Sequence, residues 1–77
     1  MAKTVLLIGG YGVFGGRLTR LLVQQKDLRV IVAGRSLDQA QRFCAIHGGE
    51  AAAFDRDGEV ERQIRALAPD IVVDAAG

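Results

Sequence analysis

Three glycines near the N-terminus have a spacing that could bind a phosphate group. In the segment LLIGGYGVFGGRL, from Leu6 to Leu18, they follow the pattern Gly10-x-Gly12-x-x-Gly15. Glycine inside a helix or strand costs about 0.5–1 kcal/mol relative to alanine, so such a cluster needs a geometric reason. In the dinucleotide fingerprint the first glycine permits a tight turn, the second lets a pyrophosphate approach the backbone, and the third lets a helix pack closely on a strand. The segment therefore predicts a dinucleotide site.

The position of this pattern between a predicted strand and a predicted helix supports that interpretation. A helix beginning near Val13 would offer free backbone N–H groups and the positive end of its dipole, and so would hold a diphosphate without a basic side chain. Two alternatives stay open. The glycines could form only a tightly packed turn, and Gly9, Gly12 and Gly15 also fit the looser G-x-x-G-x-x-G spacing of short-chain dehydrogenases and reductases.

The end of the second predicted strand indicates which dinucleotide would bind. An NAD site usually has an acidic residue about 20 positions after the glycines, where it bonds the ribose hydroxyls. Here the sequence reads AGRS, with Arg35 and Ser36 in that place and no carboxylate. A guanidinium beside a hydroxyl at a helix N-terminus suits a 2′-phosphate, which favours NADP over NAD. The alternatives are a solvated charge at Arg35 and a helix cap at Ser36.

Other residues offer weaker evidence. Asp55 follows the third predicted strand, where it could contact the adenine or cap the next helix. Ala75, Ala76 and Gly77, at the end of the fourth predicted strand, are small, as a cofactor crossing that edge requires and as an ordinary strand-to-loop passage also allows. Cys44 lies on an apolar stripe and is interpreted as core rather than as a nucleophile, and His47 has no metal-ligand partner at a suitable spacing. The sequence thus indicates no metal site and no catalytic residue.

The elements that must position these residues alternate between apolar runs and amphipathic segments. This βαβαβαβ pattern predicts an α/β fold with a parallel, doubly wound Rossmann-like sheet. Right-handed crossovers give the partial strand order 3-2-1-4, with the first two helices on one face and the third on the other. The strands are predicted at residues 4–8, 29–33, 51–54 and 70–77, and the helices within residues 13–25, 35–49 and 57–70.

Helical spacing and end signals make these predictions more specific. In the first helix the side predicted to face the sheet carries, at helical spacing, Phe14, Leu18, Leu21, Leu22 and Gln25. For the second, Ser36 and Gln39 predict a capping box, and Gly48 predicts the C-terminal stop. For the third, Asp57 is the predicted N-cap, Pro69 lies beyond the end, and the apolar stripe is Val60, Ile64 and Leu67.

Composition limits the class of protein. A chain of 77 residues allows one domain at most, here residues 1–77, and 49% hydrophobic with 25% charged residues is typical of globular proteins. Ten basic and nine acidic residues give a net charge of +1, which provides no general attraction to nucleic acid or to an anionic membrane. One cysteine excludes an internal disulfide and fits the cytoplasm. Charges recur too often for a membrane span.

The segments VLLIGGYGVFGGRL, VAGRS and DIVVDAAG together resemble the N-terminal NADP-binding domain of the saccharopine dehydrogenase family. The resemblance implies pyrophosphate contacts at Gly10, Tyr11, Gly12, Val13 and Phe14, and 2′-phosphate contacts at Arg35 and Ser36. It further implies an oxidoreductase that transfers hydride between a nicotinamide and an amino-acid-like or imine substrate. In the family the catalytic portion follows this domain, so the 77 residues alone are expected to bind the dinucleotide without catalysis.

Two other functions and one association remain open. An atypical short-chain dehydrogenase or reductase would require a Tyr-x-x-x-Lys pair, which Tyr11 does not provide. A non-catalytic module could instead bind NADP and report redox state to a partner. The fourth strand is expected at a sheet edge, where its apolar IVV segment predicts a homodimer through that strand or dependence on further polypeptide.

Overall fold

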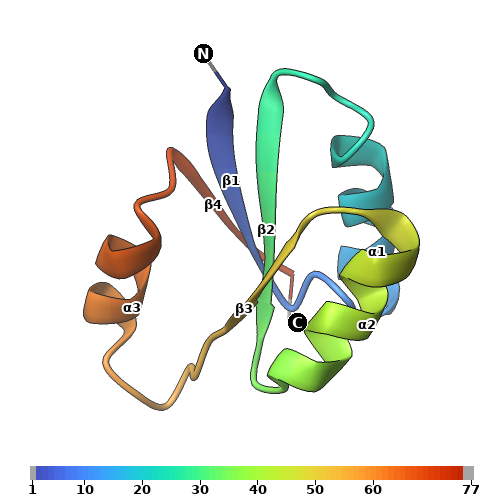
Figure 1. Ribbon diagram of the computed structural model, residues 1–77. Helices are drawn as coiled ribbons and strands as arrows, with labels where there is room; N and C mark the ends of the chain where they lie inside the picture. The colour runs from blue at the N-terminus through green and yellow to red at the C-terminus, as the bar shows by residue number, and fades with distance from the viewer. Residues whose placement is uncertain (1, 76–77) are drawn as a thin grey trace.

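The computed structural model of the protein describes residues 2–75, which form a parallel sheet flanked by helices (Figure 1). The sheet order is β3-β2-β1-β4, which confirms the predicted topology. In chain order the elements are β1 (Lys3–Ile8), α1 (Val13–Leu22), β2 (Leu28–Gly34), α2 (Leu37–His47), β3 (Glu50–Ala53), α3 (Val60–Leu67) and β4 (Ile71–Asp74).

The two faces of the sheet carry separate hydrophobic cores. Figure 1 shows α1 and α2 together on one face and α3 alone on the other, as the crossover rule predicts. Alternation along the strands divides their side chains: Val5 and Leu7 point toward α1 and α2, whereas Leu6 and Ile8 point toward α3. All four are buried, because β1 lies between two other strands. The continuous apolar run in β1 is therefore covered on both sides.

The edge strand β4 is joined to β1 at its beginning by a side chain. The Asp70 carboxylate accepts a hydrogen bond from the Thr4 backbone N–H at 2.7 Å, and the Asp70 N–H donates to the Thr4 carbonyl at 2.8 Å. From there β4 continues in register, with Val5 opposite Ile71. Its outer edge has no neighbouring strand among residues 2–75.

The predicted stripe on α1 is partly wrong. Leu18 and Leu22 pack against the core, but Phe14 is 68% exposed and Leu21 is 63% exposed. The helix turns a different face to the sheet, with Gly15, Gly16 and Thr19 buried. Close approach to the strand is possible only where side chains are smallest, so the glycines decide which face is buried.

The ends of the helices also differ in part from the predictions. Ser36 does cap α2, since its hydroxyl accepts a hydrogen bond from the Gln39 N–H at 3.2 Å, and α2 ends at Gly48 with a positive φ of 96°. The reciprocal half of the capping box is absent among residues 2–75, because the Ser36 N–H donates to the Tyr11 hydroxyl instead. Asp57 is not the N-cap of α3; Glu59 holds that position without a side-chain cap bond.

Element boundaries shift by a few residues. The strand β3 begins at Glu50 and ends at Ala53, one residue earlier than predicted at each end. Phe54 follows it and is buried on the α3 face, with its N–H bonded to the Gly34 carbonyl at 2.8 Å. Ile64 and Leu67 pack on this core, as predicted, whereas Val60 is exposed.

No helix within residues 2–75 has the length and apolar character required to cross a bilayer.

Candidate dinucleotide-binding site

A groove of about 440 Å³ lies at the carboxyl ends of the strands. In open α/β sheets this is the edge where ligands bind, beside the point at which the strand order reverses between β1 and β4. It receives residues from the β1–α1 loop, the end of β2, and the segments that follow β3 and β4. Its lining consists of Ile8, Gly9, Tyr11, Gly12, Gly34, Arg35, Phe54, Arg56 and Ala75.

Two of the motif glycines are required by the protein's own packing. A Cβ on Gly15 would collide with the Gly9 carbonyl oxygen, and backbone atoms there cannot move aside cheaply. A Cβ on Gly10 would lie 3.0 Å from the Thr19 hydroxyl oxygen, which itself donates to the Gly10 carbonyl at 2.9 Å. The left-handed residue of the expected tight turn is Gly9, with φ 79°, rather than Gly10. Both predicted glycines therefore lie behind the groove, supporting its wall.

Gly12 differs from the other two glycines. It has an ordinary φ of −76°, and a Cβ placed there would meet only the Gly9 carbonyl oxygen, at 3.5 Å. It is the N-cap of α1 and lines the groove. The first intrahelical bond runs from the Gly16 N–H to the Gly12 carbonyl at 2.6 Å, so the preceding N–H groups of the first turn lack a helical acceptor. Gly12 thus presents bare backbone at the groove, and the N–H groups without a helical acceptor follow it in the first turn of α1.

The residues predicted for the 2′-phosphate lie at the β2–α2 turn. Arg35 lines the groove, and its guanidinium forms an ion pair with the Asp57 carboxylate at 3.2 Å. Both side chains are mostly exposed, 77% for Arg35 and 83% for Asp57, so the pair is screened and worth little. Ser36 follows with its hydroxyl engaged in the cap of α2.

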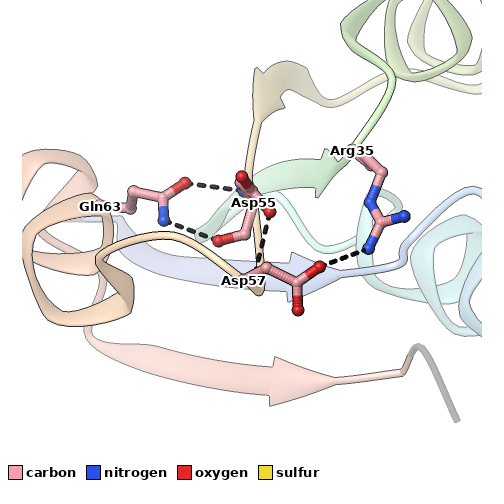
Figure 2. A network of polar contacts seen from close by, with 4 residues as sticks. All are labelled: Arg35, Asp55, Asp57 and Gln63. Carbon is pink, nitrogen blue, oxygen red and sulfur yellow. Dashed lines mark hydrogen bonds and ion pairs between the residues drawn. The ribbon is translucent and has the colours of Figure 1, made fainter.

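Asp55 takes part in the polar network shown in Figure 2 rather than in a helix cap. Its side chain accepts a hydrogen bond from the Asp57 N–H at 2.9 Å. Its backbone is held at both ends by the Gln63 side chain, at 2.7 Å on the N–H and 2.8 Å on the carbonyl. The alternative that Asp55 caps α3 is therefore wrong. The network fixes the β3–α3 loop beside Arg35.

The structure brings some predicted residues together and leaves others apart. Tyr11, Gly12, Arg35 and Ala75 line one groove, and the Ala75 N–H is bonded to the Ile8 carbonyl at 2.8 Å. Val13 and Phe14 are exposed in the first turn of α1 and do not line it. Ala76 lies outside the described residues.

Gly34, Phe54 and Arg56 line the groove and were not among the site residues predicted from the sequence. Gly34 ends β2 directly beneath the Tyr11 ring, and Phe54 forms an apolar wall. Arg56 adds a second guanidinium and forms an ion pair with Asp74 at 3.0 Å, which links the segments after β3 and β4. A basic residue shortly after a strand end was the available signal for Arg56.

Cys44 is consistent with its predicted place in the core. It packs against the core between the sheet and α2, and burial, with a smaller contribution from the Glu50 charge, raises the pKa of its thiol. A raised pKa keeps the sulfur protonated and poorly nucleophilic.

A shallower hollow of about 780 Å³ runs along α3 from Gly58 to Ala66, away from the strand ends and the glycine loop.

Comparisons with known proteins agree with this geometry. Residues 5–77 match the family described as the saccharopine dehydrogenase NADP binding domain. No curated protein matches the chain in sequence. The apo, histidine-tagged saccharopine dehydrogenase (L-Glu forming) of Saccharomyces cerevisiae is similar in structure, with a TM-score of 0.80 and 29% identity over 96% of this chain.

A crystal structure of ribose-5-phosphate isomerase from Brucella melitensis 16M has a TM-score of 0.80 and 24% identity over 99% of the chain, a likeness of fold alone. The chain spans only 16% of the yeast protein and 32% of the isomerase. The family match instead covers almost every residue, including the glycine loop and the β2–α2 turn. The chain therefore belongs to the saccharopine dehydrogenase family, as an NADP-binding domain of that family.

Proposed function

We propose that the chain binds NADP as part of an oxidoreductase that transfers hydride between the nicotinamide and an amino-acid-like or imine substrate. The observation that carries the proposal is the single groove joining the bare backbone of Gly12 to the guanidinium of Arg35. Pyrophosphate needs the first feature and a 2′-phosphate needs the second. The substrate belongs to the part of the enzyme beyond this groove.

Each residue has a distinct role in this proposal. The turn at Gly10, Tyr11 and Gly12 and the first turn of α1, with Val13 and Phe14, bind the pyrophosphate through backbone N–H groups, and Gly15 keeps that turn close to β1. Arg35 and Ser36 bind the 2′-phosphate, Asp55 lies toward the adenine, and Ala75 and Ala76 leave room for the cofactor beside β4. The nicotinamide supplies the hydride chemistry, whereas this chain supplies binding and orientation.

The residues present fit NADP in charge as well as in shape. Near-zero net charge means that the cofactor's anionic groups must be met locally, and the helix N-terminus and Arg35 do so. The existing partner of Arg35 does not oppose this, because an exposed ion pair contributes only about 0–1 kcal/mol and can be exchanged for a phosphate. A guanidinium–phosphate contact is worth about 1.5–3 kcal/mol, less where it is exposed.

The test is a comparison of Arg35→Ala with Arg42→Ala by titration with NADP and with NAD. Arg42 is a matched control, since its side chain is also 77% exposed and pairs with Asp38 at 3.0 Å on α2, outside the groove. Arg35→Ala should weaken NADP binding by about tenfold while leaving NAD binding unchanged. Arg42→Ala should leave both unchanged. An unaltered ratio of NADP to NAD affinity in Arg35→Ala would contradict the assignment of the 2′-phosphate site.

A further inference from the structure

The Tyr11 side chain connects the two loops that form the groove. It comes from the middle of the glycine loop, yet its ring lies over Gly34 at the end of β2. A Cβ on Gly34 would collide with the ring and would lie only 2.5 Å from its Cε1 atom. The absence of a side chain at Gly34 therefore leaves the space that the tyrosine ring occupies. The ring also packs against the core beneath α1 and α2, so its position is fixed by contacts on more than one side.

The hydroxyl of Tyr11 is oriented by a backbone donor. The Ser36 N–H donates to the Tyr11 oxygen at 3.3 Å, in a partly buried position. A phenol can accept one hydrogen bond and still donate its own hydrogen to another group. Within residues 2–75 that hydrogen finds no acceptor, and the side chain lines the same groove as Arg35, the residue preceding Ser36. The hydroxyl is therefore a positioned donor in the groove that Arg35 also lines.

We propose that Tyr11 is a specificity-determining residue whose hydroxyl donates a hydrogen bond to the 2′-phosphate of NADP. The inference rests on the proposed function and deepens it. It assigns the tyrosine side chain to the 2′-phosphate, which is on a different carbon of the adenosine ribose from the pyrophosphate. A phosphate dianion accepts several hydrogen bonds, and a neutral O–H supplies one without adding charge. In NAD the same place holds a hydroxyl, a weaker partner, so the contact discriminates between the cofactors.

Tyr11→Phe tests this assignment, because it keeps the ring on Gly34 and removes only the hydroxyl. The affinities of wild type and variant are measured for NADP, NAD, 2′,5′-ADP and 5′-AMP. Affinity for NADP and for 2′,5′-ADP should fall by about three- to tenfold, and affinity for NAD and 5′-AMP should change by less than about twofold. Circular dichroism before titration identifies any loss of folded protein, and the two ligands without a 2′-phosphate provide the internal control.

A spectroscopic measurement separates direct contact from a structural role. Tyr11 is the only tyrosine of the 77-residue sequence, so a ¹³Cζ-tyrosine label gives one NMR signal from the groove itself. A hydrogen bond from the hydroxyl to the 2′-phosphate changes the electronic environment of Cζ, so 2′,5′-ADP should shift that signal, whereas 5′-AMP should leave it almost unchanged.

The outcomes distinguish this inference from the proposed function. Wild-type preference for NADP that survives unchanged in Tyr11→Phe overturns the role of Tyr11 and leaves the proposed function standing. Equal weakening of NADP and NAD assigns the hydroxyl to the structure of the loop and also overturns it. A wild-type protein that binds neither NADP nor 2′,5′-ADP removes both proposals together.

Discussion

Gly12 and Gly15 belong to one motif but are glycines for different reasons. The Gly9 carbonyl occupies the space that a Gly15 side chain would need, whereas open groove adjoins Gly12. The fold therefore explains one residue and leaves the other to be explained by a ligand. A phosphate that approaches the N-terminus of α1 closely would require that open space.

The same substitution should mainly reduce stability at Gly15 and mainly reduce NADP binding at Gly12. Gly15→Ala should destabilise the protein by about 3 kcal/mol through overpacking against backbone, measured by urea unfolding. Gly12→Ala should cost about 1 kcal/mol or less, since alanine is a poorer N-cap than glycine, yet should weaken NADP binding at least about tenfold. Undiminished NADP binding by a folded Gly12→Ala protein would show that the pyrophosphate does not lie over this loop.

At this scale the sequence predicted residues whose role depends on local geometry. The glycine spacing and the cap at Ser36 are of this kind, because each involves neighbours along the chain. The contact of Tyr11 with Gly34 could not be predicted in this way. It joins two loops that become neighbours only when β1 and β2 pair in register. The periodic spacing of apolar residues along the sequence gives no information about such a contact.

Among the elements, α2 shows how tertiary contact modifies a local motif. Its first turn has the Ser36 and Gln39 pattern of a capping box, but only the serine half forms, because Tyr11 takes the Ser36 N–H. The cap thus connects the helix to the glycine loop as well as to its own first turn.

Separate substitutions of the two cap residues should therefore be unequal. Ser36→Ala should lower the free energy of unfolding by about 1 kcal/mol, because the Gln39 N–H loses its acceptor. Gln39→Ala should change it by less than about 0.3 kcal/mol, since the glutamine side chain makes no capping bond and alanine is the better helix former. Thermal and urea unfolding of both variants provide the measurement. Equal losses would mean that the full capping box forms in solution.

Helix orientation was less predictable than strand order. The order 3-2-1-4 follows from alternating elements and the handedness of crossovers, which are general properties of such chains. The buried face of α1 instead depends on which side of the helix can approach β1 closely. The glycine side is buried, although Phe14 and Leu21 on the exposed side are more hydrophobic. Apolar periodicity alone weighs side-chain hydrophobicity and takes no account of how close two backbones must come.

For the molecule as a whole, the outer edge of β4 has no neighbouring strand within residues 2–75. Ile71 and Val72 are each about 45% exposed, on a strand bonded along one side to β1. An open strand edge with apolar side chains favours pairing with another chain, and two copies would meet through a two-fold axis. We propose association through this strand, either with a second copy or with further polypeptide.

Sedimentation of the 77-residue chain at micromolar concentration tests this proposal. The wild type should sediment as a dimer, and Val72→Lys should shift it toward monomer, because a charge on an edge strand opposes pairing. Ile46→Lys is the matched control, since Ile46 is equally apolar and more exposed but lies on α2. A stable wild-type monomer that unfolds cooperatively would contradict the proposal.

The pairing of β1 with β4 also has a consequence for the order of events during synthesis. The Asp70 carboxylate accepts a hydrogen bond from the Thr4 N–H, 66 positions earlier in the sequence. One side of β1, the first strand to be synthesised, is therefore completed only when residues near the end of these 77 have left the ribosome. Every strand pair here is parallel and bridges a helix, so few contacts are local and each closure costs chain entropy first. Until β4 emerges, the nascent β1 and β2 expose an unpaired apolar edge to chaperones and to other chains.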